Sequence, residues 1–90
     1  MLDPVGGSAS PLSLRCCRWG AQVLVVGFAS GTIPTLPVNI ALVKNLTVHG
    51  IYWGSYMARD PEVLRRGLSQ LLGWVADGTI TVHVSHRYDH

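Results

Sequence analysis

Histidine and cysteine are the residues of this chain whose types most readily support chemistry. The chain contains four histidines and two cysteines: His49, His83, His86, His90, Cys16 and Cys17. A zinc site is disfavoured, because residues three apart on an extended segment, such as His83 and His86, point to opposite faces, and because no Cys-x-x-Cys or helical histidine pair is present. A cysteine nucleophile remains open, although nothing in the sequence positions a histidine against either thiol. We therefore predict no metal ligand and no catalytic residue, and expect Cys16 and Cys17 to be buried, inert thiols.

The composition describes one small globular domain with an excess of apolar residues. The 90 residues are 48% hydrophobic and 13% charged, and the formal net charge is +2. An apolar excess of this kind suits a piece of a larger protein whose surfaces meet absent partners. Because the net charge is small and the basic residues are scattered, we expect no nucleic-acid partner.

The compartment is predicted from the cysteines and from the absence of targeting patterns. A disulfide between the adjacent Cys16 and Cys17 is geometrically awkward, which favours a reducing compartment. No secretory signal is visible, and Pro34 and Pro37 interrupt the uncharged stretch of residues 19–43, so we expect no membrane span. These patterns predict a cytoplasmic protein, or a mitochondrial one if the full-length protein carries a transit peptide.

One buried strand organises the rest of the chain. Residues 23–26 are four consecutive apolar residues, three of them β-branched, followed by Gly27 and further small residues up to Gly31. Such a run is typical of a strand covered on both faces in a parallel sheet. Ligands of open parallel sheets bind beyond the carboxyl ends of the strands, so residues 27–31 form a candidate binding edge.

Helices and strands alternate along the chain and predict strand–helix–strand units. The Gly6-Gly7 pair is expected to end a short first strand. Asp60 is expected to cap the clearest helix at its start, and Gly78 to end it. The expected elements are helices over residues 8–19, 38–44 and 61–77, and strands over residues 46–53 and 79–84. Leu68 and Leu71 are expected to pack against the sheet. The pattern predicts an α/β fold with a parallel sheet, but it lacks the glycine-rich fingerprint of a dinucleotide site.

An ordered set of short motifs resembles one known family. The motifs are Asp3-Pro4-Val5-Gly6-Gly7, Ser13-Leu14-Arg15-Cys16, Trp19-Gly20, residues 23–31, residues 44–54, Asp60-Pro61-Glu62 and His83-Val84-Ser85-His86. Together they resemble quinone oxidoreductase-like proteins, in the zinc-independent branch of the medium-chain dehydrogenase/reductase superfamily. The resemblance implies a partial Rossmann-type fold: a short, mainly parallel sheet with flanking helices, incomplete at both ends. Residues 1–78 would be the later part of the nucleotide-binding domain, and residues 79–90 the start of the return segment to a missing catalytic domain.

The same resemblance implies where a cofactor would lie. NADP(H) is the implied cofactor, with its nicotinamide half against Val26, Gly27, Phe28, Ala29 and Ser30, largely through backbone groups. The next strand would close the pocket, and the first loop would border the cofactor nearer its middle. The residues implied in the next strand are Ile51, Tyr52 and Trp53. Those implied in the first loop are Pro4, Val5 and Gly6. Phe28 and Trp53 are equally well explained as core or interface aromatics.

The resemblance leaves three functional classes open. The first is a fragment or truncated form of an NADPH-dependent quinone or enone reductase, a hydride-transferring oxidoreductase that is inactive alone. The second is a non-catalytic α/β binding or dimerisation module, and the third is a remnant without a stable fold. We also predict a homodimer, or an aggregate, through the strand of residues 46–51, because no charge or proline protects that edge.

Overall fold

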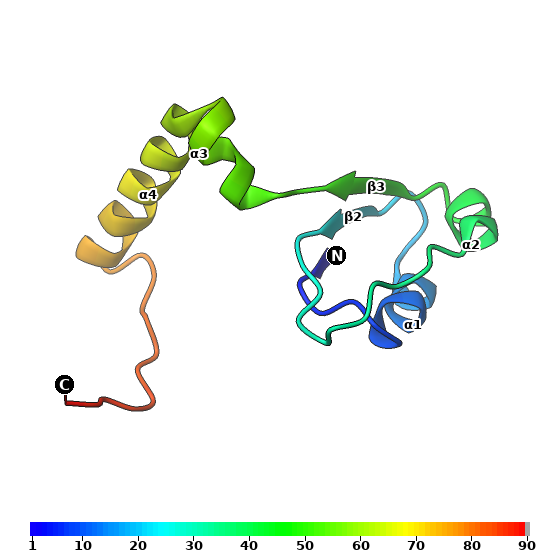
Figure 1. The fold of residues 1–90 in the computed structure, drawn as a ribbon, viewed down its shortest axis with the longest axis horizontal. Coiled ribbons are helices and arrows are strands. Elements are labelled where there is room, and N and C mark those ends of the chain that lie inside the picture. Colours follow the sequence, from blue (N-terminus) through cyan, green and yellow to red (C-terminus); the bar gives the residue numbers. More distant parts are fainter. Residues whose placement is uncertain (90) are drawn as a thin grey trace. The chain divides into compact units, whose positions relative to one another are not determined.

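The computed structural model describes residues 1–89 and contains two compact units. The first unit is Met1–Trp53, and the second begins at Gly54. In the first unit, β1 (Leu2–Asp3), α1 (Ala9–Cys16), β2 (Gln22–Val25), α2 (Val38–Val43) and β3 (Thr47–Gly50) alternate along the chain (Figure 1). The second unit contains most of the short helix η1 (Trp53–Ser55), then α3 (Tyr56–Arg59) and α4 (Pro61–Ala76).

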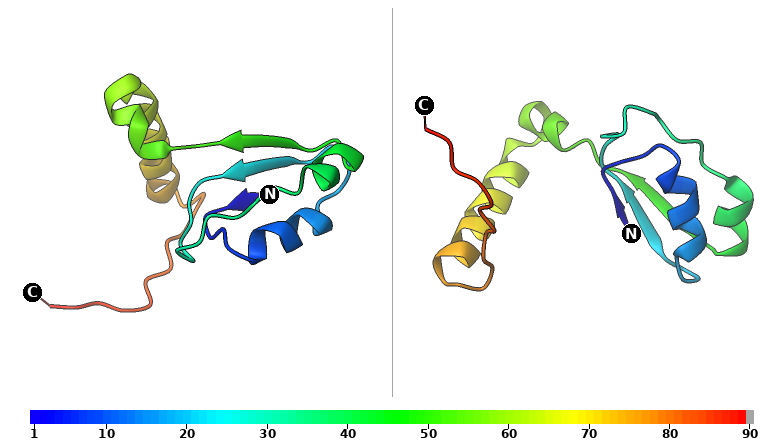
Figure 2. Two further views of the ribbon diagram at one scale, coloured as in Figure 1. Left: turned by 45° about the vertical axis from the view of Figure 1, so that its right-hand side comes forward. Right: turned by 90° about the horizontal axis from the view of Figure 1, so that it is seen from below.

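The three strands form a parallel sheet in the order β1-β2-β3. The register pairs Leu2 with Leu24, and Val23 with Val48. Both crossovers run in the same direction across the sheet, and Figure 2 shows α1 and α2 on the same side of it. This arrangement confirms the predicted fold class, an α/β unit of partial Rossmann type with a short parallel sheet and flanking helices.

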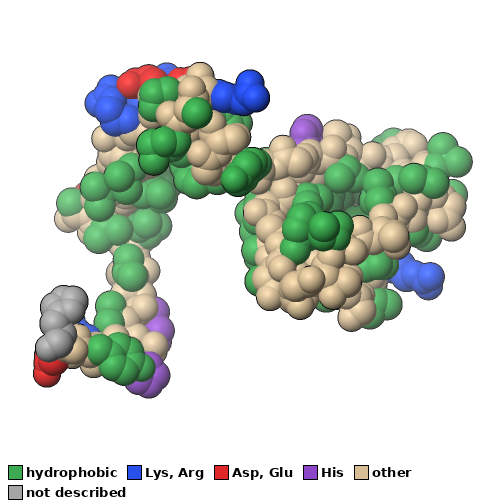
Figure 3. Space-filling model, in the orientation of Figure 1, with side chains coloured by type: hydrophobic (Ala, Val, Ile, Leu, Met, Phe, Trp, Pro, Cys, Tyr) green, Lys and Arg blue, Asp and Glu red, His purple; other side chains and the backbone are tan. Residues whose placement is uncertain are grey.

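The core of the first unit is small. Leu14 of α1 and Val23 of β2 are each only 2% exposed and mark where the helix packs on the sheet. Many other large apolar side chains remain exposed, as Figure 3 shows over both units. Parallel sheets are normally covered on both faces, so this unit has less cover than its strand pattern calls for.

The carboxyl end of α1 is capped by a side chain from another part of the unit. Lys44 Nζ donates hydrogen bonds to the carbonyl oxygens of Leu14 (3.4 Å), Cys17 (2.7 Å) and Arg15. The last carbonyls of a helix have no partner within the helix, and a cation there also complements the helix dipole. Gly20 N–H in turn donates to the Lys44 carbonyl at 2.7 Å, so this lysine joins the end of α1 to the turn before β2.

The long helix α4 lies within one residue of its predicted bounds. Pro61 occupies its first turn, and Gly78, with φ +80°, ends it in the left-handed conformation. The Gly78 N–H donates to the Val75 carbonyl at 3.3 Å. Asp60 stands at the N-cap position but makes no side-chain capping hydrogen bond, so the predicted role of its carboxylate is wrong.

Two expectations about the second unit are wrong. Residues 79–84 form no strand, because a strand requires a neighbour to hydrogen-bond with and no described segment pairs with them. Leu68 and Leu71 are 59% and 48% exposed, so the apolar stripe of α4 is not buried as predicted. Nor, over the part of the chain that is described, is any helix both long and apolar enough to cross a bilayer.

Candidate functional site

A pocket of about 600 Å³ opens at the carboxyl ends of β2 and β3. Its lining residues come from the ends of the two strands and the segments that follow: Val25, Val26, Gly27, Phe28, Gly50, Ile51 and Tyr52. Five of these residues, all but Val25 and Gly50, were predicted site residues. The structure therefore brings together the two strand ends that the sequence analysis placed in one site.

The parallel register explains why these residues meet. Val25 pairs with Gly50, and the Ile51 N–H donates to the Val25 carbonyl at 2.9 Å. The two strands therefore end at the same level, and the chain beyond each of them lies at the same edge of the sheet. The space beside Gly50 is open, because a Cβ placed on it would meet no atom within 4 Å.

The loop after β1 runs beside the loop after β2. The Ala29 and Ser30 N–H groups each donate at 3.0 Å, to the carbonyls of Pro4 and Val5 respectively. Gly27 permits this approach, because a Cβ at that position would lie 3.3 Å from the Pro4 carbonyl oxygen. The backbone amides of Ala29 and Ser30 are thus used within the protein, so these residues shape the edge of the site and are not free donors.

Asp3 holds the first loop in place, a role that was not predicted for it from the sequence. Its side chain is 8% exposed, and Oδ1 accepts hydrogen bonds from the N–H groups of Val5 (3.0 Å) and Gly6 (2.9 Å). The hydrogen bond from Gly6, followed by those from Ser10 and Val5, lowers the pKa of the Asp3 carboxyl below its ordinary value of 3.8. An Asp-Pro step that begins a turn was the available signal.

The aromatic residues of the candidate site differ in their exposure. Phe28 is 41% exposed and Tyr52 is 80% exposed, and both line the pocket. Trp53 is 54% exposed and begins η1, and it does not line the pocket. Apart from the Tyr52 phenol, the described lining residues carry no acid, base or thiol. The pocket can hold a flat apolar group, but it offers little acid–base chemistry of its own.

Phe28 also borders a second, inner cavity. This space of about 130 Å³ lies beneath the loop between β2 and α2. Its lining is largely apolar and comes from the sheet, α1 and that loop: Ser10, Leu14, Val23, Val25, Phe28, Ile33, Pro34, Thr35, Leu36 and Val48. Phe28 and Val25 therefore line both the candidate site and this cavity.

The histidines and cysteines of the described chain do not form a common site. Among residues 1–89, no three His, Cys, Asp or Glu side chains are grouped so as to hold a metal ion. His86 stacks on Tyr88 with ring centroids 6.2 Å apart, while His90 lies outside the described residues. Cys16 is exposed and Cys17 is half-buried, so the expectation of two buried thiols is wrong for Cys16. Cys16 is the last residue of α1.

Comparison with known proteins gives relatives but no matching family model. The chain is 39% identical over 80 residues to quinone oxidoreductase-like protein 2 homolog from Nematostella vectensis, covering 89% of this chain and 22% of that protein. It is 36% identical over 89 residues to quinone oxidoreductase-like protein 2 from Bos taurus, covering 99% of this chain and 26% of that protein. The chain therefore spans about a quarter of the length of the curated relatives it matches. These matches confirm the resemblance found in the sequence: nearly the whole chain is similar to one segment of the quinone oxidoreductase-like proteins.

Proposed function

We propose that this chain is the C-terminal part of an NADPH-dependent oxidoreductase of the quinone or enone reductase type, with the nicotinamide half of the cofactor held in the pocket beyond β2 and β3. One observation carries the proposal. Residues implied by the resemblance on two separate segments, 26–28 and 51–52, line a single pocket at the carboxyl edge of a parallel sheet. That edge is where open α/β sheets bind their ligands. Residues 1–78 would then belong to the nucleotide-binding domain, and the segment after them would lead back toward a catalytic domain.

The residues present fit such a ligand. A pocket of about 600 Å³ is within the usual range for small-molecule sites, and its walls are mainly aliphatic and aromatic. Val26 and Ile51 would support one side of a flat ring, while Phe28 and Tyr52 would screen it from water. When bound, the nicotinamide supplies hydride chemistry, and the protein binds and orients it. Pro4, Val5 and Gly6 would act by fixing the neighbouring loop.

We expect the isolated chain to be inactive. The sequence contains no glycine-rich pyrophosphate loop, so only part of NADPH has candidate contacts here. NADPH oxidation in the presence of a simple quinone, at micromolar chain and above a blank without protein, would contradict this expectation.

Binding at the pocket is tested separately from activity. We would titrate the ¹⁵N-labelled chain with NADPH and, in parallel, with adenosine 2′,5′-bisphosphate, which lacks the nicotinamide. The proposal expects amide shifts at residues 26–28 and 50–52 with NADPH only. A Gly50→Val variant, which adds a branched side chain at the pocket, should weaken these shifts, whereas Thr47→Val on the same strand should not. Shifts confined to other residues, or equal shifts with both ligands, would count against the site.

A second role, as a dimerisation module, is favoured by the outer edge of β3. The N–H groups of Thr47 and Ile51 donate to carbonyls of the β2 side, at 3.1 and 2.9 Å. Alternation along the strand therefore directs the N–H of Val48 away from β2. No described strand pairs with that outer side of β3, and residues 47–50 include no acid, Lys, Arg or Pro. A second copy pairing along residues 46–51 would satisfy this edge.

A further inference from the structure

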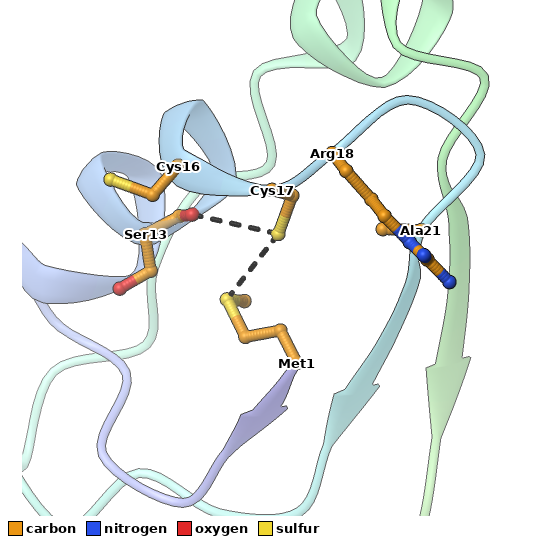
Figure 4. A pocket seen from close by; sticks show the side chains of 6 residues that line it. All are labelled: Met1, Ser13, Cys16, Cys17, Arg18 and Ala21. Carbon is orange, nitrogen blue, oxygen red and sulfur yellow. Dashed lines mark hydrogen bonds between the residues drawn. The ribbon is translucent and has the colours of Figure 1, made fainter.

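A third pocket lies at the opposite edge of the sheet from the candidate site. It has a volume of about 460 Å³ and is formed by residues near the starts of β1 and β2 and the end of α1. Its lining residues are Met1, Ser13, Cys16, Cys17, Arg18 and Ala21, shown in Figure 4. Because Met1 precedes β1 and Ala21 precedes β2, this pocket is at the amino edge of the sheet and shares no residue with the proposed cofactor site.

Two sulfur atoms meet in this pocket. Cys17 Sγ lies 3.8 Å from Met1 Sδ and 3.5 Å from the Ser13 carbonyl oxygen. The thiol is a weak donor and the thioether sulfur a weak acceptor, so the thiol is held in place without a strong hydrogen bond. Figure 4 shows the Cys17 thiol directed toward Met1 and the Cys16 thiol directed away from it.

We propose that Cys17 and Met1 form a binding site for a soft monovalent metal ion, Cu(I) or its analogue Ag(I). Thiolate and thioether sulfurs are the ligands that select Cu(I) over harder ions. With metal–sulfur bonds of roughly 2.3 Å, as for zinc, two sulfurs 3.8 Å apart subtend an angle of roughly 110° at the metal. An ion therefore fits between them with little movement, and its remaining position faces the open pocket, where a small thiol or chloride can complete the coordination.

The binding step balances in charge and protons. Cys17–SH loses its proton to solvent, the thiolate bonds to the cation, and Met1 Sδ donates a lone pair, with no change of oxidation state. The group is neutral when a neutral thiol is the third ligand and carries one negative charge when chloride is, and neither form is repelled by the Arg18 side chain that also lines the pocket. Zinc is a poor alternative, because the described lining lacks the histidine or carboxylate that would complete four ligands around the cysteine sulfurs.

The backbone on both sides of the pair is already fixed. The Cys17 N–H donates to the Leu14 carbonyl at 3.2 Å, and the Cys17 carbonyl accepts from Lys44 Nζ at 2.7 Å. The Met1 carbonyl accepts from the Leu24 N–H at 2.8 Å, which holds Met1 beside β2. A metal site gains affinity when its ligands are held before binding, because less motion is lost on binding.

The first test uses the two methionines of the chain as reporter and internal control. The chain with ¹³C-labelled methionine methyl groups is titrated with Ag(I), which does not change its oxidation state during the experiment. Up to one equivalent, the Met1 methyl signal should shift, while that of Met57, which is 71% exposed in the other unit, should not. Equal shifts of both signals, or no shift of Met1, would overturn the proposal. This test needs no variant.

The second test separates the two cysteines. Cu(I) affinity is measured under reducing conditions by competition with a chromogenic Cu(I) chelator, and an amide spectrum verifies the fold of each variant. Cys17→Ser should weaken binding by at least the roughly 10–100-fold that loss of even an outer-shell partner costs, whereas Cys16→Ser should leave it within about 3-fold. Similar losses in both variants, or binding retained in Cys17→Ser, would show that the chain binds the metal elsewhere.

Discussion

Replacing Lys44 by methionine should destabilise the first unit by about 1–2 kcal/mol. Methionine keeps the apolar stem but removes the charge and the three donors that reach the carbonyls at the end of α1. Hydrogen bonds to a charged group are worth about 1.5–3 kcal/mol, and a cation at a helix carboxyl end adds about 0.3–1 kcal/mol. Because Lys44 is only half-buried, water replaces part of what is lost, and the net effect falls below the sum of these terms.

Urea unfolding followed by far-ultraviolet circular dichroism gives the change in free energy of unfolding. Arg87→Met is the matched control, because it removes one positive charge from an exposed position in the second unit. Amide hydrogen exchange adds a local measurement, since protection should fall first at residues 14–17. If Lys44→Met changes the free energy of unfolding by less than about 0.5 kcal/mol, as ordinary surface changes do, the capping argument is refuted.

Three further predictions follow from the described contacts. Val48→Pro should abolish any self-association measured by sedimentation while β2 and β3 stay paired. Val48→Ala, which keeps the N–H, should leave self-association unchanged. A dimer that survives the proline would contradict pairing of two copies along residues 46–51. Gly6→Ala should cost about 1–3 kcal/mol in thermal unfolding, because φ is +69° and the added Cβ would lie 2.9 Å from Phe28 Cδ1. Gly20→Ala, with φ +72° and open space around it, should cost less, and equal costs would rule out the steric part of the argument. The pKa of Asp3 is lowered in the folded state, so the ionised carboxylate stabilises the fold. This stabilisation should be complete at pH values above the ordinary pKa of 3.8, and it should be lost as the pH falls through the lower pKa of the folded state. An Asp3→Asn variant should lack this part of the acid sensitivity in urea midpoints measured between pH 6 and pH 2.

Local sequence patterns predicted the elements whose start, stop and pairing signals lie within the chain itself. The run at residues 23–26 predicted β2 because consecutive β-branched residues favour a buried strand, and the structure gives Gln22–Val25. The periodic stripe with Pro61 and Gly78 predicted α4 because start and stop signals flank it. Within the site, the short spacing of residues 26–28 and 51–52 beyond two parallel strands explains why the two segments converge.

Patterns failed where the structure depends on something outside the segment. Residues 79–84 alternate like a strand, but alternation does not provide the neighbour that a ladder requires. The apolar character of Leu68 predicts a buried face but does not identify what covers it, and the side chain is 59% exposed. Asp3 was missed because a single acid beside a proline gains its meaning only from the Val5 and Gly6 amides that turn back to it.

The position of Phe28 has a consequence for how far the candidate site can vary. Phe28 lines both the pocket beyond β2 and the inner cavity, as Val25 does. A smaller residue there would enlarge the site for bulkier ligands and would also enlarge the inner cavity, which Leu14 lines. A change at Phe28 would thus affect both the range of ligands and the folding stability. A substitution of Phe28 that admits larger ligands therefore needs a second, cavity-filling substitution beneath the loop between β2 and α2.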